Sequence, residues 1–452
     1  MTALQLATPY PSAGDWLAAR HLEHAVRGTV LVPGDDEYDA ERATWSGAVR
    51  SRPVAIALAD SAADVRAALA VARDHDLPFA VQSTGHGTSV ACDGGILVKT
   101  AAMSEVLIDP ARRTARVGAG TRWGEVIAAA APLGLAPISG SAASVGVAGY
   151  TLGGGVGWLS RRYGFAADSL VSAEVVTAGG ELVTASADEH ADLFWALRGG
   201  GANFGVVTSM EIRLHPAARV YGGSALFPLA RAAGLLAALR DQAATQPDEL
   251  NVAVVLLKDA SAQGVAGPAV LVRGVHTGAA ADAERALQPL WAAAGAPLAN
   301  DFRPMDYAST GALGGTAPRA FQLHEDLPDA LVDAAVEAVA QRTVNAIEVR
   351  HWGGAMADPD GGPVGHRDVP FSLTIDGEPG PALRRDATGG SFLNFLHDPA
   401  MTHAAYTPAD LRRLQDVKRA WDPDNVLGLT HNIPPARHLS VVENPSSAPT
   451  SL

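Results

Sequence analysis

The most unusual stretch of this chain is SGSAASVGVAGYTLGGGVG, residues 139–157. Glycine occupies seven of its nineteen positions, and none of its side chains is charged. A regular helix would lose about 1 kcal/mol for each interior glycine relative to alanine. We therefore interpret the stretch as backbone shaped for a close approach and not as one continuous helix.

A second glycine-containing loop, STGHGTS at 83–89, follows a strand predicted at 79–82. Loops of this kind can direct several backbone N–H groups at pyrophosphate oxygens that side chains would otherwise keep away. Neither loop has the spacing of a Rossmann fingerprint or the lysine of a P-loop. Taken alone, each loop is also compatible with a turn and close helix packing.

Regular elements surround both loops. From residue 219 the glycine clusters give way to longer helical patterns, and a last helix is predicted from Pro408 to the residues before Pro423. Organised structure is expected to begin at Arg52. Helices are predicted after Ser61, at the segment with Trp123 and Ala130 on its apolar face, and at 192–198. The strands predicted by apolar alternation and turn residues are 54–58, 79–82, 95–100, 106–109, 114–120, 171–177, 181–186, 251–257, 269–275 and a run around 345–351.

The composition limits the function classes. The chain has 34 basic and 48 acidic residues and a net charge of −14, which argues against nucleic acid binding because that requires clustered Lys and Arg. Cys92 is the only cysteine, so a disulfide framework and any cysteine-based metal site are excluded, and we predict no metal. Neither a secretory leader nor an apolar run that could span a membrane is visible, so we expect a cytoplasmic protein without membrane partners.

Four segments in order resemble the berberine bridge enzyme-like flavoprotein oxidases. They are QSTGHGTS at 82–89, GSAASVGVAGYTLGGGVG at 140–157, DLFWALRGGGANFGVVT at 192–208 and KRAWDPDNV at 418–426. This family, whose bacterial members include 6-hydroxy-D-nicotine oxidase, has the vanillyl-alcohol oxidase type of FAD-binding fold.

The resemblance implies an α+β fold with two lobes. We expect an FAD-binding lobe over 1–218, with its core at 52–218, and a substrate-binding lobe over 219–392 whose antiparallel sheet is covered by helices. The chain should return to the first lobe over 393–435 and end in a disordered tail over 436–452.

The resemblance also implies that FAD is the cofactor and that His86 bonds covalently to the flavin 8α-methyl. Many relatives attach the flavin a second time through a cysteine, but Ala142 stands at that position, so we expect a single covalent bond. Besides His86, the residues expected to bind the cofactor are Ser83, Thr84, Gly85, Gly87, Thr88, Ser89, Gly140, Ser141, Ala142, Val145, Gly146, Gly149, Tyr150, Gly153, Gly154, Gly155, Gly157, Gly205, Val206, Val207 and Asn432.

The loops depart from the family pattern at two further points. The segment 82–86 lacks an arginine and a glycine that relatives often have, and Tyr150 stands where a histidine is frequent. These changes leave FAD binding as the expectation but put the usual hydrogen bonds at the flavin edge in doubt.

A base that removes the substrate O–H or N–H proton assists hydride transfer, so the substrate lobe should supply a titratable side chain. Glu348 and His351 in EVRHWGG, and Asp376 in the strand-like FSLTID, are the candidate catalytic residues. Alternation along a strand places Glu348 and Arg350 on one face and His351 on the other. An ion pair on a solvated strand is the competing interpretation. Some relatives use a tyrosine base in the segment 392–395, and this chain has none there.

These observations predict an FAD-dependent oxidase that moves hydride from an alcohol, amine or activated C–H of a small organic molecule to the flavin, with O2 as acceptor. A secondary metabolite or alkaloid-like substrate is favoured over a sugar, because sugar-oxidising relatives commonly use the doubly attached flavin. A flavin dehydrogenase, an oxygenating flavoenzyme and a catalytically silent flavin-binding module remain alternatives. The oligomeric state is not predicted.

Overall fold

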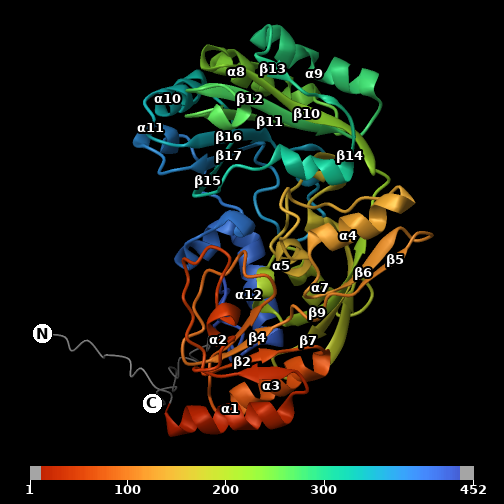
Figure 1. Ribbon diagram of the computed structural model, residues 1–452, viewed down its shortest axis with the longest axis vertical. Coiled ribbons are helices and arrows are strands. Elements are labelled where there is room, and N and C mark those ends of the chain that lie inside the picture. The colour runs from red at the N-terminus through yellow and green to blue at the C-terminus, as the bar shows by residue number, and fades with distance from the viewer. Residues whose placement is uncertain (1–11, 438–452) are drawn as a thin grey trace, which may run out of the picture.

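Three β-sheets organise residues 12–437, the part of the chain that the computed structural model describes (Figure 1). Two of them lie in the lower lobe of the view, and the third spans the upper lobe. The first sheet has the order β1-β2-β4-β3, in which β2, β4 and β3 are parallel and β1 is antiparallel. Its strands are β1 (Thr29–Leu31), β2 (Ala55–Leu58), β3 (Phe79–Gln82) and β4 (Ile96–Lys99).

Ordered structure begins before residue 52, so the predicted starting point is wrong. Helix α1 (Ala13–Ala25) starts at a capping box on Ser12, and β1 pairs with β2. The helix packs against α3 (Ala62–Asp74), but its large apolar side chains Trp16 and Leu17 are exposed. The sequence therefore shows no clear apolar face that would have predicted α1.

The second sheet is antiparallel, with the order β5-β6-β9-β7-β8. Its apolar face packs in one core with several helices, among them α5 (Val147–Leu152), which lies inside the glycine-rich stretch. Its strands are β5 (Val106–Asp109), β6 (Thr114–Gly118), β7 (Leu170–Val176), β8 (Leu182–Ser186) and β9 (Val206–Arg213). The helices in the same lobe are α2 (Tyr38–Glu41), α4 (Trp123–Ala130), α5 (Val147–Leu152), α6 (Ser160–Tyr163) and α7 (Ala191–Leu197).

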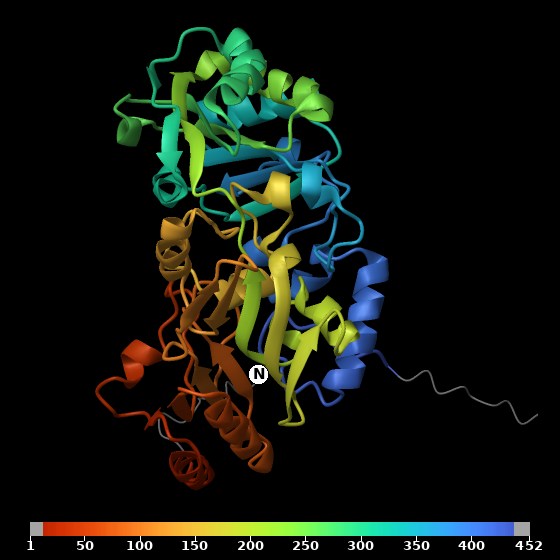
Figure 2. The ribbon, with the colours of Figure 1, turned by 90° about the vertical axis from the view of Figure 1, so that its right-hand side faces the viewer.

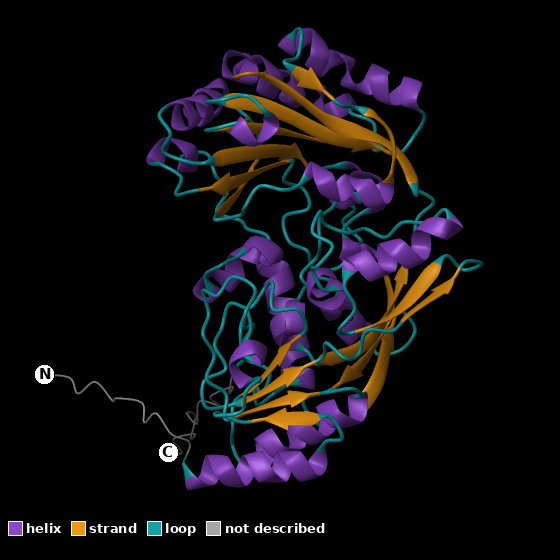
Figure 3. Ribbon diagram, viewed as in Figure 1, coloured by secondary structure: helices purple, strands orange, loops and turns teal. Residues whose placement is uncertain are grey.

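The third sheet is an eight-stranded antiparallel sheet, as Figure 3 shows in the upper lobe. Helices α8 (Ala232–Gln242), α9 (Ala280–Ala294), α10 (Asp329–Ala340) and α11 (Pro381–Arg384) belong to this lobe, and they bury its outer apolar face. The strands are β10 (Arg219–Pro228), β11 (Leu250–Leu257), β12 (Ala269–His276), β13 (Ala299–Asn300), β14 (Arg303–Asp306), β15 (Ala320–His324), β16 (Ala346–His351) and β17 (Phe371–Asp376). The expected antiparallel sheet covered by helices is confirmed.

The opposite face of this sheet is turned toward the lower lobe. Ala253 and Val255 on β11 and Leu271 on β12 share a core with Ile138 and Trp158, which flank the glycine-rich stretch. Side chains at alternate positions of the central strands therefore meet the glycine-rich stretch at the junction of the two lobes.

The chain returns to the lower lobe after β17. Helix α12 (Pro408–Trp421), blue in Figure 2, lies in that lobe and contacts α7. Most of the tail expected at 436–452 lies outside the described residues. Within residues 12–437, no helix is long and apolar enough to cross a membrane.

Candidate cofactor site and active site

The two glycine-containing loops meet in the structure. The N–H of Gly146 donates to Thr84 Oγ1 at 3.2 Å, and Ser83 Oγ donates to the Ala119 carbonyl at 2.8 Å. A Cβ added at Gly146 would lie 3.1 Å from Ser83 Oγ, so a larger residue would push the loops apart. Gly85 has φ of +75°, which a side chain rarely tolerates.

The loops expose unused backbone donors. Within the described chain, the N–H groups of residues 83–89 and 140–144 donate no hydrogen bond to protein. Backbone N–H groups are obligatory donors, and a cluster of them without protein acceptors is suited to phosphate oxygens. The loops therefore fit the pyrophosphate of a dinucleotide such as FAD.

His86 belongs to the first loop, contacts the second through its ring and is half-buried. Its Nε2 is 3.2 Å from Ser144 Oγ, and the indole of Trp45 stacks on its ring with centroids 4.1 Å apart. Burial, together with the nearby Arg122, lowers the pKa of His86 below that of a free histidine. The imidazole is therefore neutral near pH 7, as a nitrogen nucleophile must be.

Four of the predicted cofactor residues, Gly153, Gly154, Gly155 and Gly157, have a packing role in the structure. All four are buried, and a Cβ on Gly155 would lie 2.4 Å from the ring of Tyr150. A Cβ on Gly153 would clash with Asn394, one on Gly154 with Phe392, and one on Gly157 with the Ser139 carbonyl. The glycines at this end of the stretch therefore allow close packing of protein groups, which was the alternative interpretation of the stretch.

Other predicted cofactor residues are spread around the loops. Gly87 and Gly149 are exposed and would meet nothing within 4 Å if they carried a Cβ, whereas Gly140 faces the Tyr150 ring. The Oδ1 atom of Asn432 is buried and has no partner among the described residues. Within the loops, the half-buried or exposed residues also include Thr88, Ser89, Ser141, Ala142 and Val145.

Gly205, Val206 and Val207 lie at the start of β9. The two valine side chains are buried in the apolar cores of the lower lobe, on either side of the sheet. Gly205 packs against Val175 of the neighbouring strand β7. The structure therefore gives these three residues packing roles at the start of β9.

Tyr150 stands where the loops meet the substrate lobe. Its hydroxyl is buried and has no hydrogen-bond partner among residues 12–437. Burial raises the pKa of Tyr150 well above 10, with a further contribution from Tyr307 and an opposing one from Arg350. Tyr307 itself bonds through its hydroxyl to Ser139 Oγ at 2.9 Å. Two neutral phenols therefore lie at the junction of the lobes.

Glu348 and Arg350 point to the same face of β16, as the alternation predicted. Glu348 is buried between two arginines: Arg350 Nε and Arg273 Nη2 both donate to its carboxylate. Burial raises the pKa of Glu348, but Arg350 and Arg273 outweigh that effect and hold it at about 2. The Glu348 carboxylate is therefore a weak proton acceptor. The competing interpretation of an ion pair describes Glu348 better than a catalytic base does, although the pair is buried and not solvated.

His351 and Asp376 lie apart from this cluster. The His351 ring is buried against Arg161, whose Nη1 lies 2.9 Å from its Nδ1. Burial and that guanidinium lower the pKa of His351 to about 4. Asp376 is at the end of β17 and pairs with the exposed Arg319 at 2.7 Å. Glu348 and His351 therefore both contact the junction of the lobes, but of the three catalytic candidates only Glu348 belongs to the cluster with Arg350 near Tyr150.

The KRAWDPDN motif holds the C-terminal segment in place. Lys418 and Asp422 form an ion pair at 2.6 Å, and both side chains are fully buried. Lys418 also donates to the Asn203 carbonyl at 2.7 Å, and Asn203 accepts the N–H of Ile433 at 2.9 Å. The motif thus joins α12 to the glycine-rich bend before β9 and contributes to structure.

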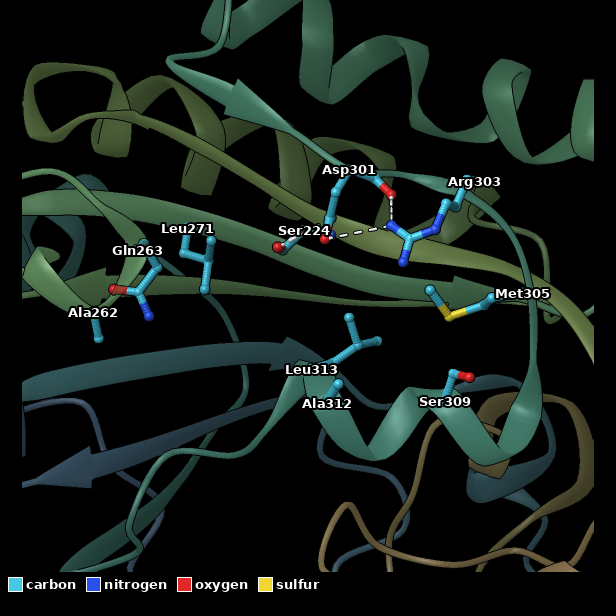
Figure 4. A pocket seen from close by; sticks show the side chains of 10 residues that line it. All are labelled: Ser224, Ala262, Gln263, Leu271, Asp301, Arg303, Met305, Ser309, Ala312 and Leu313. Carbon is cyan, nitrogen blue, oxygen red and sulfur yellow. Dashed lines mark hydrogen bonds and ion pairs between the residues drawn. The ribbon is translucent and has the colours of Figure 1, made fainter.

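A cavity of about 310 Å³ opens on the inward face of the substrate lobe (Figure 4). Its size is at the lower end of small-molecule pockets. It lies beside the cluster of Arg273, Glu348 and Arg350, because Arg273 Nη1 donates to the carbonyl of Leu313, which lines the cavity, at 2.9 Å. Residues that line it include Ser224, Leu271, Asp301, Arg303, Met305 and Leu313.

Comparison with known proteins identifies the family. Residues 53–186 match the FAD binding domain family, and residues 391–434 match the family described as berberine and berberine like. (R)-6-hydroxynicotine oxidase of Paenarthrobacter nicotinovorans is 31% identical over 451 residues, which cover 91% of this chain and 97% of that protein. The chain belongs to the berberine bridge enzyme-like family of FAD-linked oxidases. It is an FAD-dependent oxidoreductase, as predicted.

Solved structures of the family support the fold. 6-Hydroxy-D-nicotine oxidase from Arthrobacter nicotinovorans has a TM-score of 0.79 at 29% identity, with 90% of this chain and 98% of that chain covered. Physcomitrella patens BBE-like 1 has a TM-score of 0.82 at 22% identity and covers 93% of this chain and 99% of its own. A glucooligosaccharide oxidase from Acremonium strictum, at 22% identity and a TM-score of 0.80 over 93% of this chain and 99% of its own, carries a 6-S-cysteinyl, 8α-N1-histidyl FAD.

Three residues near the cofactor site were not found by sequence reasoning. Trp45 and Ser144 contact His86, and Tyr307 reaches the glycine-rich stretch from the other lobe. Ser144 lies inside the quoted stretch and could have been included, but Trp45 and Tyr307 are far from any motif. Cys92 is buried beside Leu97, and burial raises its pKa to about 12, so this thiol packs as a small apolar group.

Proposed function

We propose that this chain is an oxidase that carries FAD on a single covalent bond to His86 and uses O2 as its electron acceptor. The position of His86 carries the proposal. A neutral imidazole lies between two loops whose N–H groups have no acceptor in the described protein, and Ser144 and Trp45 hold it. Ala142 supplies no second nucleophile.

The contact with Ser144 orients the His86 ring. In the tautomer that donates its Nε2–H to Ser144 Oγ, the Nδ1 lone pair is left for bond formation. Attachment would exchange one N–H of His86 and one C–H of the 8α-methyl group for an N–C bond, and O2 would take up the two protons and two electrons as hydrogen peroxide. The histidyl linkage of the glucooligosaccharide oxidase is a precedent in another protein.

Bound FAD supplies the oxidising power, because its N5 accepts a hydride from a substrate C–H bond. The chain itself contributes a junction lined by Tyr150, Tyr307 and Arg350. Tyr150 and Tyr307 can hydrogen-bond a substrate hydroxyl or amine, since both phenols remain protonated. Glu348 positions Arg350, and we assign neither His351 nor Asp376 to the reacting atoms.

We propose a small organic substrate, an alcohol, an amine or an activated C–H compound from secondary metabolism. The relative named for 6-hydroxynicotine supports a small substrate of this kind. It would bind beneath the sheet of the segment 219–392, which we retain as the substrate lobe, with 1–218 and 393–435 as the FAD lobe. A cytoplasmic location remains part of the proposal and is tested by cell fractionation.

The test is a substrate screen on the purified yellow protein. Alcohols and amines are added without oxygen, bleaching of the flavin is recorded, and peroxide is measured when air is admitted. Bleaching followed by peroxide release is the result expected of an oxidase. Bleaching that persists in air until a dye acceptor is added contradicts the oxidase and favours a dehydrogenase. Incorporation of oxygen from O2 into the product favours an oxygenating enzyme, and a flavin that no compound bleaches favours a silent flavin-binding module.

A further inference from the structure

A buried cluster with unequal numbers of opposite charges lies on the inward face of the substrate lobe. Arg273 on β12 and Arg350 on β16 both pair with Glu348, which is the one carboxylate that either of them contacts in the described chain. Only 6% of the Arg273 side chain, 5% of Glu348 and 16% of Arg350 are exposed. Two positive charges and one negative charge leave the cluster with a net charge of +1.

The two arginines differ in how their donors are used. Arg273 donates to the Leu313 carbonyl at 2.9 Å and to Thr316 Oγ1 at 3.2 Å, in addition to Glu348. Arg350 uses only Nε, toward Glu348, and its Nη1 and Nη2 have no acceptor among residues 12–437. Within the described part of the chain, Arg273 leaves one buried donor, Nε, without a partner, whereas Arg350 leaves both of its amino groups without a protein acceptor.

The outer end of Arg350 is fixed and faces the junction. Its guanidinium carbon lies 4.2 Å from the ring centroid of Trp158, which immediately follows the glycine-rich stretch. It is close enough to Tyr150 to oppose the rise in the pKa of that phenol. Two unused guanidinium N–H₂ groups and an unpartnered phenol thus lie together where the lobes meet.

A buried cluster with one more positive than negative charge is costly, and a planar guanidinium with two unused amino groups matches the two oxygens of a carboxylate. We propose that Arg350 binds a carboxylate of the substrate, so that the substrate class is small organic acids with an oxidisable alcohol, amine or C–H group. This inference rests on the proposed function, because it concerns the substrate of the same site. The same anionic oxygen chemistry could instead be supplied by a carbonyl edge of the flavin, and the experiment separates the two sources.

The experiment titrates the yellow holoenzyme with matched pairs of a carboxylate and its primary amide. Benzoate with benzamide, phenylacetate with phenylacetamide, and indole-3-acetate with its amide are added while the flavin absorbance spectrum is recorded. We expect at least one carboxylate to bind about tenfold or more tightly than its amide, and Arg350→Gln to abolish that preference. Arg350→Lys, which keeps the charge but loses the planar fork, should retain part of it.

Arg219→Gln is the matched control, because Arg219 is on β10 of the same sheet but forms an exposed pair with Asp306. This variant should bind like the wild type. If no carboxylate binds more tightly than its amide, or if the preference survives in Arg350→Gln, the inference is overturned. A lower flavin reduction potential in Arg350→Gln without any carboxylate preference in the wild type would assign the arginine to the flavin and also overturn it. Protein that binds no FAD would overturn the proposed function, and the inference with it.

Discussion

Replacing Glu348 by glutamine should strongly destabilise the protein. The substitution keeps the shape of the side chain but removes the one negative charge between Arg273 and Arg350. Both guanidinium groups would then be buried without a counter-charge at the junction of the lobes. Removing one member of a buried ion pair typically costs about 3–5 kcal/mol of unfolding free energy.

The lowered pKa of Glu348 gives a second estimate of the loss of unfolding free energy. It falls from 4.5 in a free glutamate to about 2, chiefly because Arg350 and Arg273 outweigh the effect of burial. At about 1.4 kcal/mol for each pH unit, this shift corresponds to roughly 3 kcal/mol of stability near neutral pH. Both estimates are compatible with a loss of about 3–5 kcal/mol of unfolding free energy in Glu348→Gln.

The sign of the pH dependence follows from the depressed pKa. The folded-state pKa lies below the unfolded one, so the stabilisation is complete above about pH 4.5 and is lost as the pH falls toward 2. Glu348→Gln has no such group to titrate. The stability gap between wild type and variant should therefore narrow by about 1 kcal/mol between pH 7 and pH 4.

Urea denaturation followed by tryptophan fluorescence measures both effects. Asp376→Asn is the control, because Asp376 pairs with an arginine that is 71% exposed and its loss should cost less than about 1 kcal/mol. The reasoning is refuted if Glu348→Gln costs less than about 1 kcal/mol, or if the gap stays constant or widens as the pH falls.

Three further outcomes are expected. Lys418→Met removes one member of a fully buried ion pair and should cost about 3–5 kcal/mol of unfolding free energy, measured by urea denaturation. Arg419→Met removes an exposed ion pair on the same helix and should cost less than about 1 kcal/mol. Equal losses would contradict the structural role of the KRAWDPDN motif. Ser144→Ala should lower the fraction of flavin that co-precipitates with acid-denatured protein, because His86 loses its hydrogen bond; an unchanged fraction and an unchanged rate of attachment would show that Ser144 does not orient the ring. Asn394→Ala should cost about 1–3 kcal/mol, since the N–H of Gly155 loses its acceptor at 2.8 Å; a loss within error of zero would show that this link is unimportant.

The sequence predicted features that depend on local order. The loops at 83–89 and 139–157 were found because their composition departs from that of helices and strands, and strand alternation placed Glu348 and Arg350 on one face. The order of the motifs predicted the family and hence the two lobes and the covered antiparallel sheet.

Features that depend on distant pairing were not predicted. Glu348 meets Arg273 across 75 residues of sequence, and only the register of β11, β12 and β16 brings them together. This pairing changes the carboxylate from a candidate base into a positioning group. Likewise, Gly155 could not be distinguished from a cofactor-binding glycine, because the Tyr150 ring that it accommodates is placed by tertiary packing.

His86 is expected to hold FAD covalently where the two loops meet. The most direct measurement is acid precipitation of the purified protein and of His86→Ala, followed by flavin absorbance and fluorescence in pellet and supernatant. Flavin should remain in the wild-type pellet and be released entirely from the variant. Flavin that is released from the wild type, or that stays in the pellet of His86→Ala, would contradict covalent attachment at His86.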